Sequence, residues 1–281
     1  MNNMMIRAIS GAVYVGLIVA CCVSGPWWFF GLCLLFSLLA VNELGSLAGP
    51  YPVTARACDL AMAAAIITTV YGIMLPWQGP MSAAAVLIPL LIPLRMWVAV
   101  ASREERPAPL RSAFFSFAGI VYVCFPLAML FISYSVMGWR IVLTAFILIW
   151  LNDTGAYLSG RTWGRRKMCE RLSPKKTWEG FWGGFALCVV AGALAPLCIY
   201  PADALKWEYF VASGIFGAVV SLASTMGDLF ESLVKRSLGV KDSGRLIPGH
   251  GGILDRIDSL LAVAPLLMVY CLVLAVIRLG F

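Results

Sequence analysis

Nine apolar stretches, each close to the length that crosses a lipid bilayer, follow one another along this chain of 281 residues. A helix needs about 20 apolar residues to span the hydrocarbon layer. Apolar residues make up 61% of the sequence and charged residues only 12%, whereas a soluble domain carries about 25% charged residues. We therefore expect an all-α, polytopic transmembrane protein with about nine spans. They are 8–24, 27–43, 59–75, 82–101, 113–134, 141–158, 181–200, 209–230 and 259–277. A re-entrant pair is the alternative for the first two, which only a Ser24-Gly25-Pro26 turn separates.

The basic residues orient these spans, because loops on the cytoplasmic side carry an excess of Lys and Arg. With a cytoplasmic N-terminus, seventeen of the 21 Lys and Arg residues fall in inside segments. Only Arg140, Lys206 and Arg278 fall outside, and Arg95 lies within the fourth span. This distribution predicts a cytoplasmic N-terminus and a C-terminus on the outer side.

The polar residues divide the chain into two regions. We expect N-terminal transmembrane helices over 1–140 and a C-terminal transmembrane catalytic region over 141–281, with cytoplasmic loops at 159–180 and 231–258. The net charge of +7 resides in such loops, so anionic headgroups or a phosphorylated ligand are the expected partners, and no nucleic acid. The nine cysteines lack metal-binding spacing, and we expect them to act as small buried hydrophobes.

Four carboxylates from three spans reach one depth near the cytoplasmic side. Asp153 lies roughly 18 Å along its span from Ile141, past the midplane. Asp228 ends the eighth span on the same side, and Asp255 and Asp258 open the ninth. Acidic residues in membrane spans are costly, which marks them as candidates for function.

The four carboxylates indicate which metal ion the site would bind. Carboxylates without nearby Cys or His suit Mg²⁺, which takes one or two carboxylates together with substrate phosphates and water. The alternative is that the acids form structural salt bridges with Lys235, Arg236 and Arg256. Asp228, Glu231, Ser232 and Lys235 also lie on one helical face, at spacings of three, four and seven from Asp228.

Two loop motifs are candidates for binding phosphate. Gly249, Gly251 and Gly252 surround the only histidine, His250, just before a helix start, where exposed amides favour an anion. His250 itself is a phosphate contact, a loop hydrogen-bonder or a helix cap. The run 173–177, Ser-Pro-Lys-Lys-Thr, would hold a polyphosphate or serve as a positive-inside anchor.

The C-terminal motifs resemble those of a known family. Ser232 to Arg236, Lys241 to Gly244 and Ile247 to Asp258 match the signature of phosphatidate cytidylyltransferases, also called CDP-diacylglycerol synthases. Ser173 to Gly180 and Asn152 to Tyr157 resemble two further blocks of that family. The resemblance is strong from about 150 to 260 and implies the reaction of CTP with phosphatidate to give CDP-diacylglycerol and pyrophosphate.

The resemblance also implies roles for individual residues. The expected catalytic residues are Asp228, Lys235, Arg236, Lys241, His250, Asp255, Arg256 and Asp258. The expected substrate-binding residues are Asn152, Asp153, Ser173, Lys175, Lys176, Thr177, Glu179, Ser232, Gly251 and Gly252. One or two cations, Mg²⁺ first, are expected on Asp228 and Asp255, with Asp258 and Asp153 in support. The expected partners are CTP, phosphatidate, the lipid bilayer and a second copy in a homodimer.

Other functions are compatible with parts of this pattern. A transporter or channel also carries intramembrane acids, but here the acids gather at one depth and no inverted repeat is apparent. A CTP-dependent lipid-alcohol kinase and a cytidylyltransferase for ether lipids are closer alternatives, whereas a structural scaffold leaves the polar clusters unexplained. We expect a multi-pass protein of a bacterial inner membrane, with its active site facing the cytoplasm.

Overall fold

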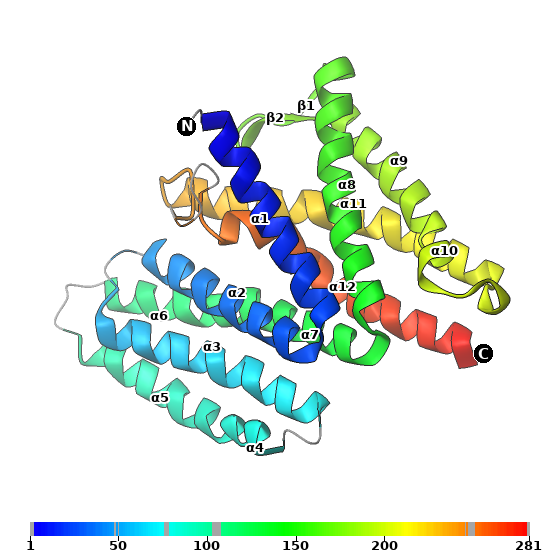
Figure 1. Cartoon of the computed structure of the whole chain (residues 1–281). Coiled ribbons are helices and arrows are strands. Elements are labelled where there is room, and N and C mark those ends of the chain that lie inside the picture. Colours follow the sequence, from blue (N-terminus) through cyan, green and yellow to red (C-terminus); the bar gives the residue numbers. More distant parts are fainter. Residues whose placement is uncertain are drawn as a thin grey trace. The chain divides into compact units, whose positions relative to one another are not determined.

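Helices dominate the computed structural model, which describes residues 3–47, 49, 51–75, 79–102, 108–244, 246 and 251–279 (Figure 1). Seven helices in these ranges are long and apolar enough to cross a membrane. Two shorter apolar helices, 8–24 and 178–194, coincide with the first and seventh predicted spans. The prediction of an all-α polytopic membrane protein is therefore confirmed, while the number of spans and the sides of the termini stay predictions.

The chain forms two compact units. The first consists of residues 1–135 and 238–257, and the second of residues 136–237 and 258–281. The boundary at 135 lies close to the predicted division at 140. Residues 238–257 group with the N-terminal helices, and the functional division at 140 stays a prediction.

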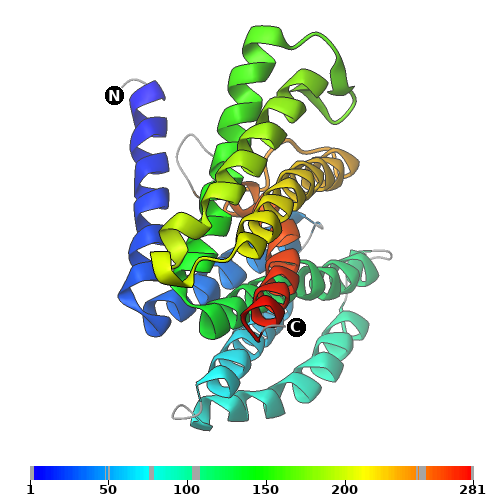
Figure 2. The ribbon, with the colours of Figure 1, turned by 90° about the vertical axis from the view of Figure 1, so that its right-hand side faces the viewer.

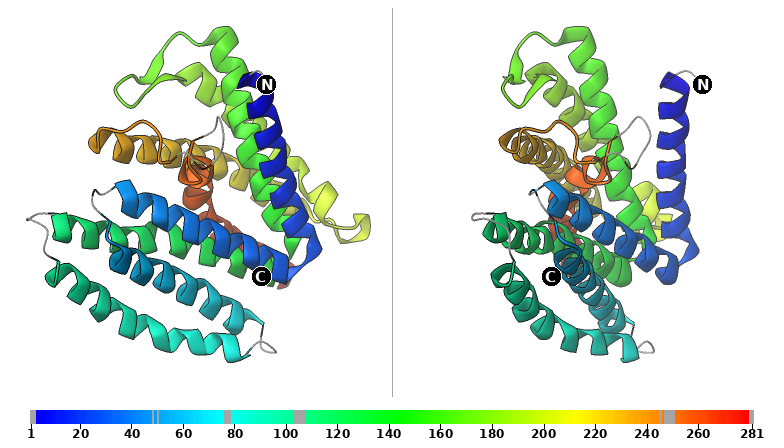
Figure 3. Two further views of the ribbon diagram at one scale, coloured as in Figure 1. Left: turned by 60° about the vertical axis from the view of Figure 1, so that its left-hand side comes forward. Right: turned by 90° about the vertical axis from the view of Figure 1, so that its left-hand side faces the viewer.

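The described part of the first unit contains helices α1 to α7, two short helical segments and the first turn of α12 (Leu254–Leu279). The helices and segments before α12 are α1 (Asn3–Ser24), α2 (Pro26–Leu47), α3 (Val53–Met74), α4 (Gly79–Ser82), η2 (Ala83–Val86), α5 (Leu87–Val100), α6 (Ala108–Gly119), η3 (Ile120–Cys124, a π-helical turn) and α7 (Phe125–Met137). Helix α2 packs against α3 and α6, and α3 packs against α5, so these helices lie side by side (Figure 3). Gly25 separates α1 from α2 with a φ of +116°, which glycine adopts readily.

An aromatic cluster and one ion pair hold the first unit together. The rings of Phe29 and Tyr134 stack with centroids 4.4 Å apart. Arg95 is the one buried residue of α5, and its Nε lies 2.9 Å from Oδ1 of Asp59 on α3. Nη2 of Arg95 also donates to Oγ of Ser112 and of Ser116, each over 2.8 Å. The arginine that the sequence placed within a span is therefore paired with a carboxylate inside the protein.

The second unit consists of long helices and one short hairpin. They are α8 (Trp139–Trp163), β1 (Lys167–Cys169), β2 (Ser173–Thr177), α9 (Trp178–Leu194), α10 (Pro196–Ile199), η4 (Ala202–Ala204), α11 (Trp207–Ser237) and most of α12 (Leu254–Leu279). Helix α9 packs against both α8 and α11 (Figure 2). Glycines allow this approach: a Cβ on Gly184 would lie only 2.7 Å from the carbonyl oxygen of Asn152.

Both predicted cytoplasmic loops are shorter in the structure. The loop 159–180 contains the antiparallel pair β1–β2, which the apolar pattern of the sequence did not predict. The loop 231–258 is reduced to 238–253, because α11 continues to Ser237 and α12 already begins at Leu254.

Candidate active site

A polar cavity of about 260 Å³ opens in the second unit. Helices α8, α9 and α11 and the β1–β2 hairpin all contribute to its wall. Six of the predicted site residues line it: Asn152, Asp153, Lys175, Lys176, Thr177 and Asp228. The cavity thus brings together residues of the motifs 152–157 and 173–180 with Asp228, which was predicted from its depth.

Opposite charges face each other inside this cavity. Nζ of Lys176 lies 2.6 Å from Oδ2 of Asp228, and the two side chains are 25% and 39% exposed. Partial exposure leaves both groups accessible to a solute. The pair joins the Ser-Pro-Lys-Lys-Thr hairpin to the polar end of α11, and it gives each charge a partner when no ligand is bound.

Two polar residues shape the cavity wall. Asn152 is 4% exposed, and its Oδ1 accepts a hydrogen bond of 2.7 Å from Oγ of Ser221 on α11. Thr177 is the N-cap of α9, because its Oγ1 accepts from the amide of Gly180 over 3.1 Å. Both side chains therefore have a structural partner in addition to the predicted contact with substrate.

Glu179 fastens the start of the hairpin to α9. Its carboxylate accepts hydrogen bonds of 3.0–3.2 Å from the amides of Arg165 and Arg166. Hydrogen bonds from its own backbone amide first, and from that of Arg165 next, hold the pKa of Glu179 below its usual value of 4.5. Ser173, the other predicted residue here, is the first residue of β2.

The polar face of α11 continues beyond the cavity. Oγ of Ser232 lies 3.4 Å from Oδ1 of Asp228, and Nζ of Lys235 lies 2.7 Å from Oε2 of Glu231. The predicted face is therefore present, but Lys235 pairs with a carboxylate of its own helix. Arg236 is exposed beside it.

The first unit holds the other group of predicted residues, in the segment that leads into α12. Oδ2 of Asp255 accepts hydrogen bonds from the amide of Ser243 (3.0 Å), its Oγ (3.1 Å) and the amide of Gly252 (2.8 Å). Gly251 has a φ of +84°, a conformation that favours glycine. Lys241 and Arg256 are exposed. His250 lies outside the described residues.

A carboxylate that the sequence analysis missed completes this segment. Glu43 of α2 accepts hydrogen bonds from the amides of Ile253 (2.8 Å) and Leu254 (2.9 Å). The amide of Gly252, in the turn expected to bind phosphate, thus donates to a carboxylate of the protein itself, as do the amides of Ile253 and Leu254 that follow it. An acidic residue at the end of an apolar span was the signal that could have identified Glu43.

Asp258, on the part of α12 that belongs to the second unit, lies beside α11. Its Oδ1 accepts from the amide of Ser259 over 2.6 Å. A Cβ on Gly227 would lie 2.7 Å from the carbonyl oxygen of Asp258, so glycine allows the two helices to meet there. Asp258 is therefore close to the polar end of α11.

The predicted metal ligands fit a cation only with help from a substrate. Among the described residues, no group of three or more His, Cys, Asp or Glu side chains is arranged to hold a metal ion. Asp153 and Asp228 nevertheless line one cavity. Two carboxylates completed by phosphate oxygens and water are a set of ligands that Mg²⁺ accepts.

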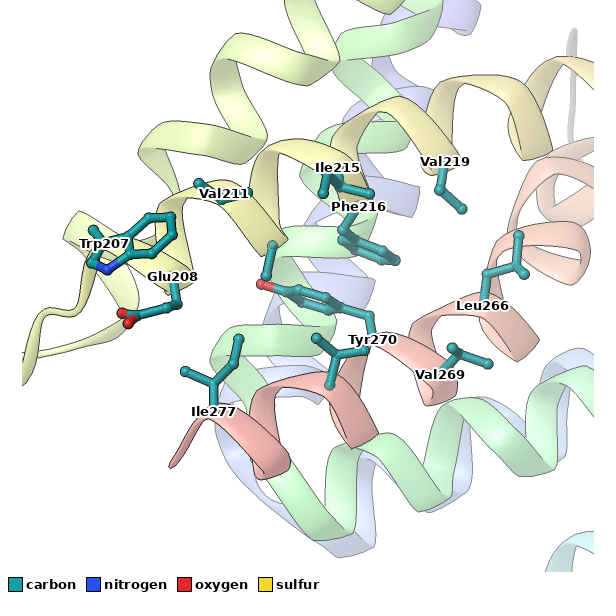
Figure 4. Close-up of a pocket in the computed structure, with 12 residues that line it drawn as sticks. Trp207, Glu208, Val211, Ile215, Phe216, Val219, Leu266, Val269, Tyr270 and Ile277 are labelled. Atoms are coloured by element: carbon teal, nitrogen blue, oxygen red, sulfur yellow. The ribbon is translucent and has the colours of Figure 1, made fainter. Parts of the chain in front are cut away.

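A larger cavity, of about 520 Å³, lies between α11 and α12 and differs in character (Figure 4). Val211, Ile215, Val269 and other apolar side chains line it, and Glu208 is its one charged lining residue. Such a surface suits hydrocarbon and offers little to a nucleotide. The smaller polar cavity is therefore the better candidate for chemistry on phosphates.

Comparison with known proteins agrees with the motifs. The cytidylyltransferase family model matches residues 5–274. Proteins called phosphatidate cytidylyltransferase share a segment of 130 residues that covers 46% of this chain. Staphylococcus epidermidis has one that is 48% identical over 48% of its length, Haemophilus influenzae one that is 47% identical over 44%, and Staphylococcus aureus one that is 47% identical over 48%. The chain thus spans about half the length of the curated relatives it matches.

Proposed function

This chain belongs to the cytidylyltransferase family, and from that premise we propose that it joins CTP to phosphatidate within the membrane. A phosphate oxygen of phosphatidate attacks the α-phosphorus of CTP in line. The new oxygen–phosphorus bond forms as the bond to the β-phosphate breaks, which gives CDP-diacylglycerol and pyrophosphate. Because the nucleophile is already an anion, the mechanism requires no covalent enzyme intermediate.

The polar cavity of the second unit is the observation that supports this proposal. Two lysines, Lys175 and Lys176, and two aspartates, Asp153 and Asp228, line one opening among apolar helices. A triphosphate needs cationic contacts, and a site for two polyanions must offset their repulsion. A channel or scaffold offers no reason for this combination.

The pair of Lys176 and Asp228 is proposed to separate when substrates bind. The lysine would donate to a phosphate of CTP, and the aspartate would turn to a cation with Asp153 beside it. A bound Mg²⁺ would neutralise phosphate charge and orient the reacting oxygens. The two side chains then exchange one partner for another, so that no charge is left unpaired.

The remaining predicted residues keep their proposed roles. Lys235, Arg236, Lys241 and Arg256 would bind phosphates or stabilise the leaving pyrophosphate. Asp255 would keep its expected role as a cation ligand, and Asp258 its expected role in support. His250, Gly251 and Gly252 would shape the turn that leads into α12. We propose that these groups face the cytoplasm, where CTP is dissolved, while the acyl chains of phosphatidate stay in the bilayer.

The reaction is tested with the purified protein, CTP, phosphatidate and Mg²⁺, with and without EDTA. Both CDP-diacylglycerol and pyrophosphate are expected, and both should disappear with EDTA. Release of CDP in place of pyrophosphate, with a lipid alcohol as acceptor, would identify a kinase. Absence of both products from a folded sample would overturn the proposal.

A further inference from the structure

Glu43 lies near the end of α2 and is buried, with 8% of its surface exposed. Besides the amides of Ile253 and Leu254, its Oε2 accepts a hydrogen bond of 3.0 Å from Oγ of Ser243. One carboxylate thus joins a helix near the N-terminus to a segment about 200 residues later in the chain. A buried carboxylate is costly unless donors such as these surround it.

The backbone amides that donate to Glu43 lie at the N-terminus of α12. Ile253 and Leu254 carry amides of the first turn of α12, which lack partners within the helix. A negative charge at that end is also favoured by the helix dipole. Glu43 therefore caps α12 from another helix, and it fixes the direction in which α12 begins.

Asp255 also accepts hydrogen bonds from this segment. It accepts from Ser243 and Gly252, whereas Glu43 accepts from Ser243, Ile253 and Leu254. Among the described residues, Ser243 is therefore the one that donates to both carboxylates. Between α11 and α12 the described chain has no regular helix or strand, so these contacts take the place of secondary structure.

Two glycines show how closely Glu43 is surrounded. A Cβ on Gly244 would lie 2.7 Å from Oε1 of Glu43, and a Cβ on Gly252 would clash with Glu43 and Ser243. These glycines are needed for the approach of a protein carboxylate. The sequence had assigned Gly252 to the approach of a substrate.

We infer that Glu43 is a positioning residue of the transferase: it acts on turnover by fixing Asp255 and the start of α12. This inference rests on the proposed function. Glu43 makes its contacts through the protein backbone and Ser243, so substitution should change the rate of the chemical step more than the affinity for CTP. A displacement of about 1 Å in such a site costs roughly 100-fold in rate.

The test compares Glu43→Gln with Tyr134→Phe. The glutamine side chain keeps one acceptor oxygen, but its NH2 group faces a backbone amide of Ile253 or Leu254, which is also a donor. Tyr134→Phe removes a buried hydrogen bond of 3.0 Å to the carbonyl of Cys22 in the same unit, and so controls for lost stability. Per folded molecule, Glu43→Gln should lower kcat by about 10- to 100-fold with an almost unchanged KM for CTP. Tyr134→Phe should leave both constants near the wild-type values.

Double substitution with Ser243→Ala sharpens the result. Since Ser243 donates to Glu43, the losses in kcat for Glu43→Gln and Ser243→Ala should not multiply. Tyr134→Phe combined with Ser243→Ala should have the kcat of Ser243→Ala alone. A wild-type kcat for Glu43→Gln, or losses that multiply, would overturn the inference.

A second measurement does not require activity. Trypsin should cleave after the exposed Lys241 faster in Glu43→Gln than in Tyr134→Phe at equal thermal stability. Equal rates of cleavage would show that Glu43 does not hold the segment. If the wild-type protein makes no CDP-diacylglycerol while cleavage still differs, the proposed function fails and the structural contact stands.

Discussion

Lys176 is the side chain whose removal tests nucleotide binding most directly. Its ammonium lies in the polar cavity 2.6 Å from Asp228, where a triphosphate would compete for it. A lost hydrogen bond to a charged group costs about 1.5–3 kcal/mol, so Lys176→Ala should raise the KM for CTP by roughly 10- to 100-fold. Lys167→Ala, on the exposed neighbouring strand β1, is the matched control. An unchanged CTP dependence for Lys176→Ala would remove the hairpin from the nucleotide site.

Substitution of Asp255 by asparagine removes the negative charge of the side chain while keeping its size. Asparagine can keep the hydrogen bonds that Oδ2 accepts from Ser243 and Gly252, so Asp255→Asn should remain folded. If the negative charge supports a cation or orients phosphate, kcat should fall by at least ~100-fold, as for other lost electrostatic contacts. Thermal unfolding and kcat measured on the same sample check both expectations. Asp203→Asn, at an exposed carboxylate, should change neither, and near wild-type turnover by Asp255→Asn would contradict the metal assignment.

For single residues, the predicted depth along each span correctly indicated which carboxylates lie together in the second unit. Counting along the spans brought Asp153 and Asp228 to the same level, and both line the polar cavity. It could not reveal Glu43, because a hydrogen bond across 200 residues leaves no local pattern. It also could not show that Gly252 and its neighbours already donate to carboxylates.

Among the elements, the hairpin should respond to acid through Glu179. The folded state lowers the pKa of this carboxyl, so its stabilising effect is complete above 4.5 and is lost as the pH falls through the lower folded value. Protection of the Arg165 and Arg166 amides against hydrogen exchange should be constant from pH 7 to about pH 5 and decrease at lower pH. Glu179→Gln should abolish this pH dependence. Unaltered protection at low pH would mean that other contacts hold the hairpin.

Helix α5 depends on a buried ion pair. Only Arg95 of this helix is buried, and it pairs with Asp59, to which Tyr51 also donates over 2.9 Å. Removing one partner leaves a charge without compensation, which costs about 3–5 kcal/mol. Asp59→Leu and Arg95→Leu should therefore each lower the midpoint of thermal unfolding in detergent, and the double variant should recover much of the loss. Additive losses would contradict the ion-pair interpretation.

The elements themselves were largely predictable. Apolar runs of membrane length identified nearly every long helix, because the hydrocarbon layer requires internal hydrogen bonds that a helix supplies. The β1–β2 hairpin was not predicted, because the strand Ser173–Thr177 is polar and lacks the alternation of apolar and polar residues that is typical of a half-buried strand. Helix ends were also misplaced: the predicted span ended at 230, whereas polar residues such as Lys235 and Arg236 continue α11 to Ser237.

On the scale of the whole chain, contacts distant in sequence decided the organisation. The family resemblance, argued from motifs between 150 and 260, is confirmed by a match over residues 5–274. The grouping of 238–257 with the N-terminal helices was not predictable from composition, because it follows from contacts such as those of Glu43.

The sidedness of the protein can be read from two of its own cysteines. Seven of the nine thiols are buried, whereas Cys169 on the hairpin is partly exposed and Cys198 on α10 is exposed. The excess of basic residues near Cys169 predicts a cytoplasmic hairpin, and α9 then carries the chain toward the outer side. A membrane-impermeant maleimide should label Cys198 in right-side-out vesicles and Cys169 in inverted ones, with Cys169→Ser and Cys198→Ser as controls. The reverse pattern would place the proposed site on the side away from cytoplasmic CTP. Labelling of both cysteines from the same side would contradict the prediction that α9 crosses the membrane.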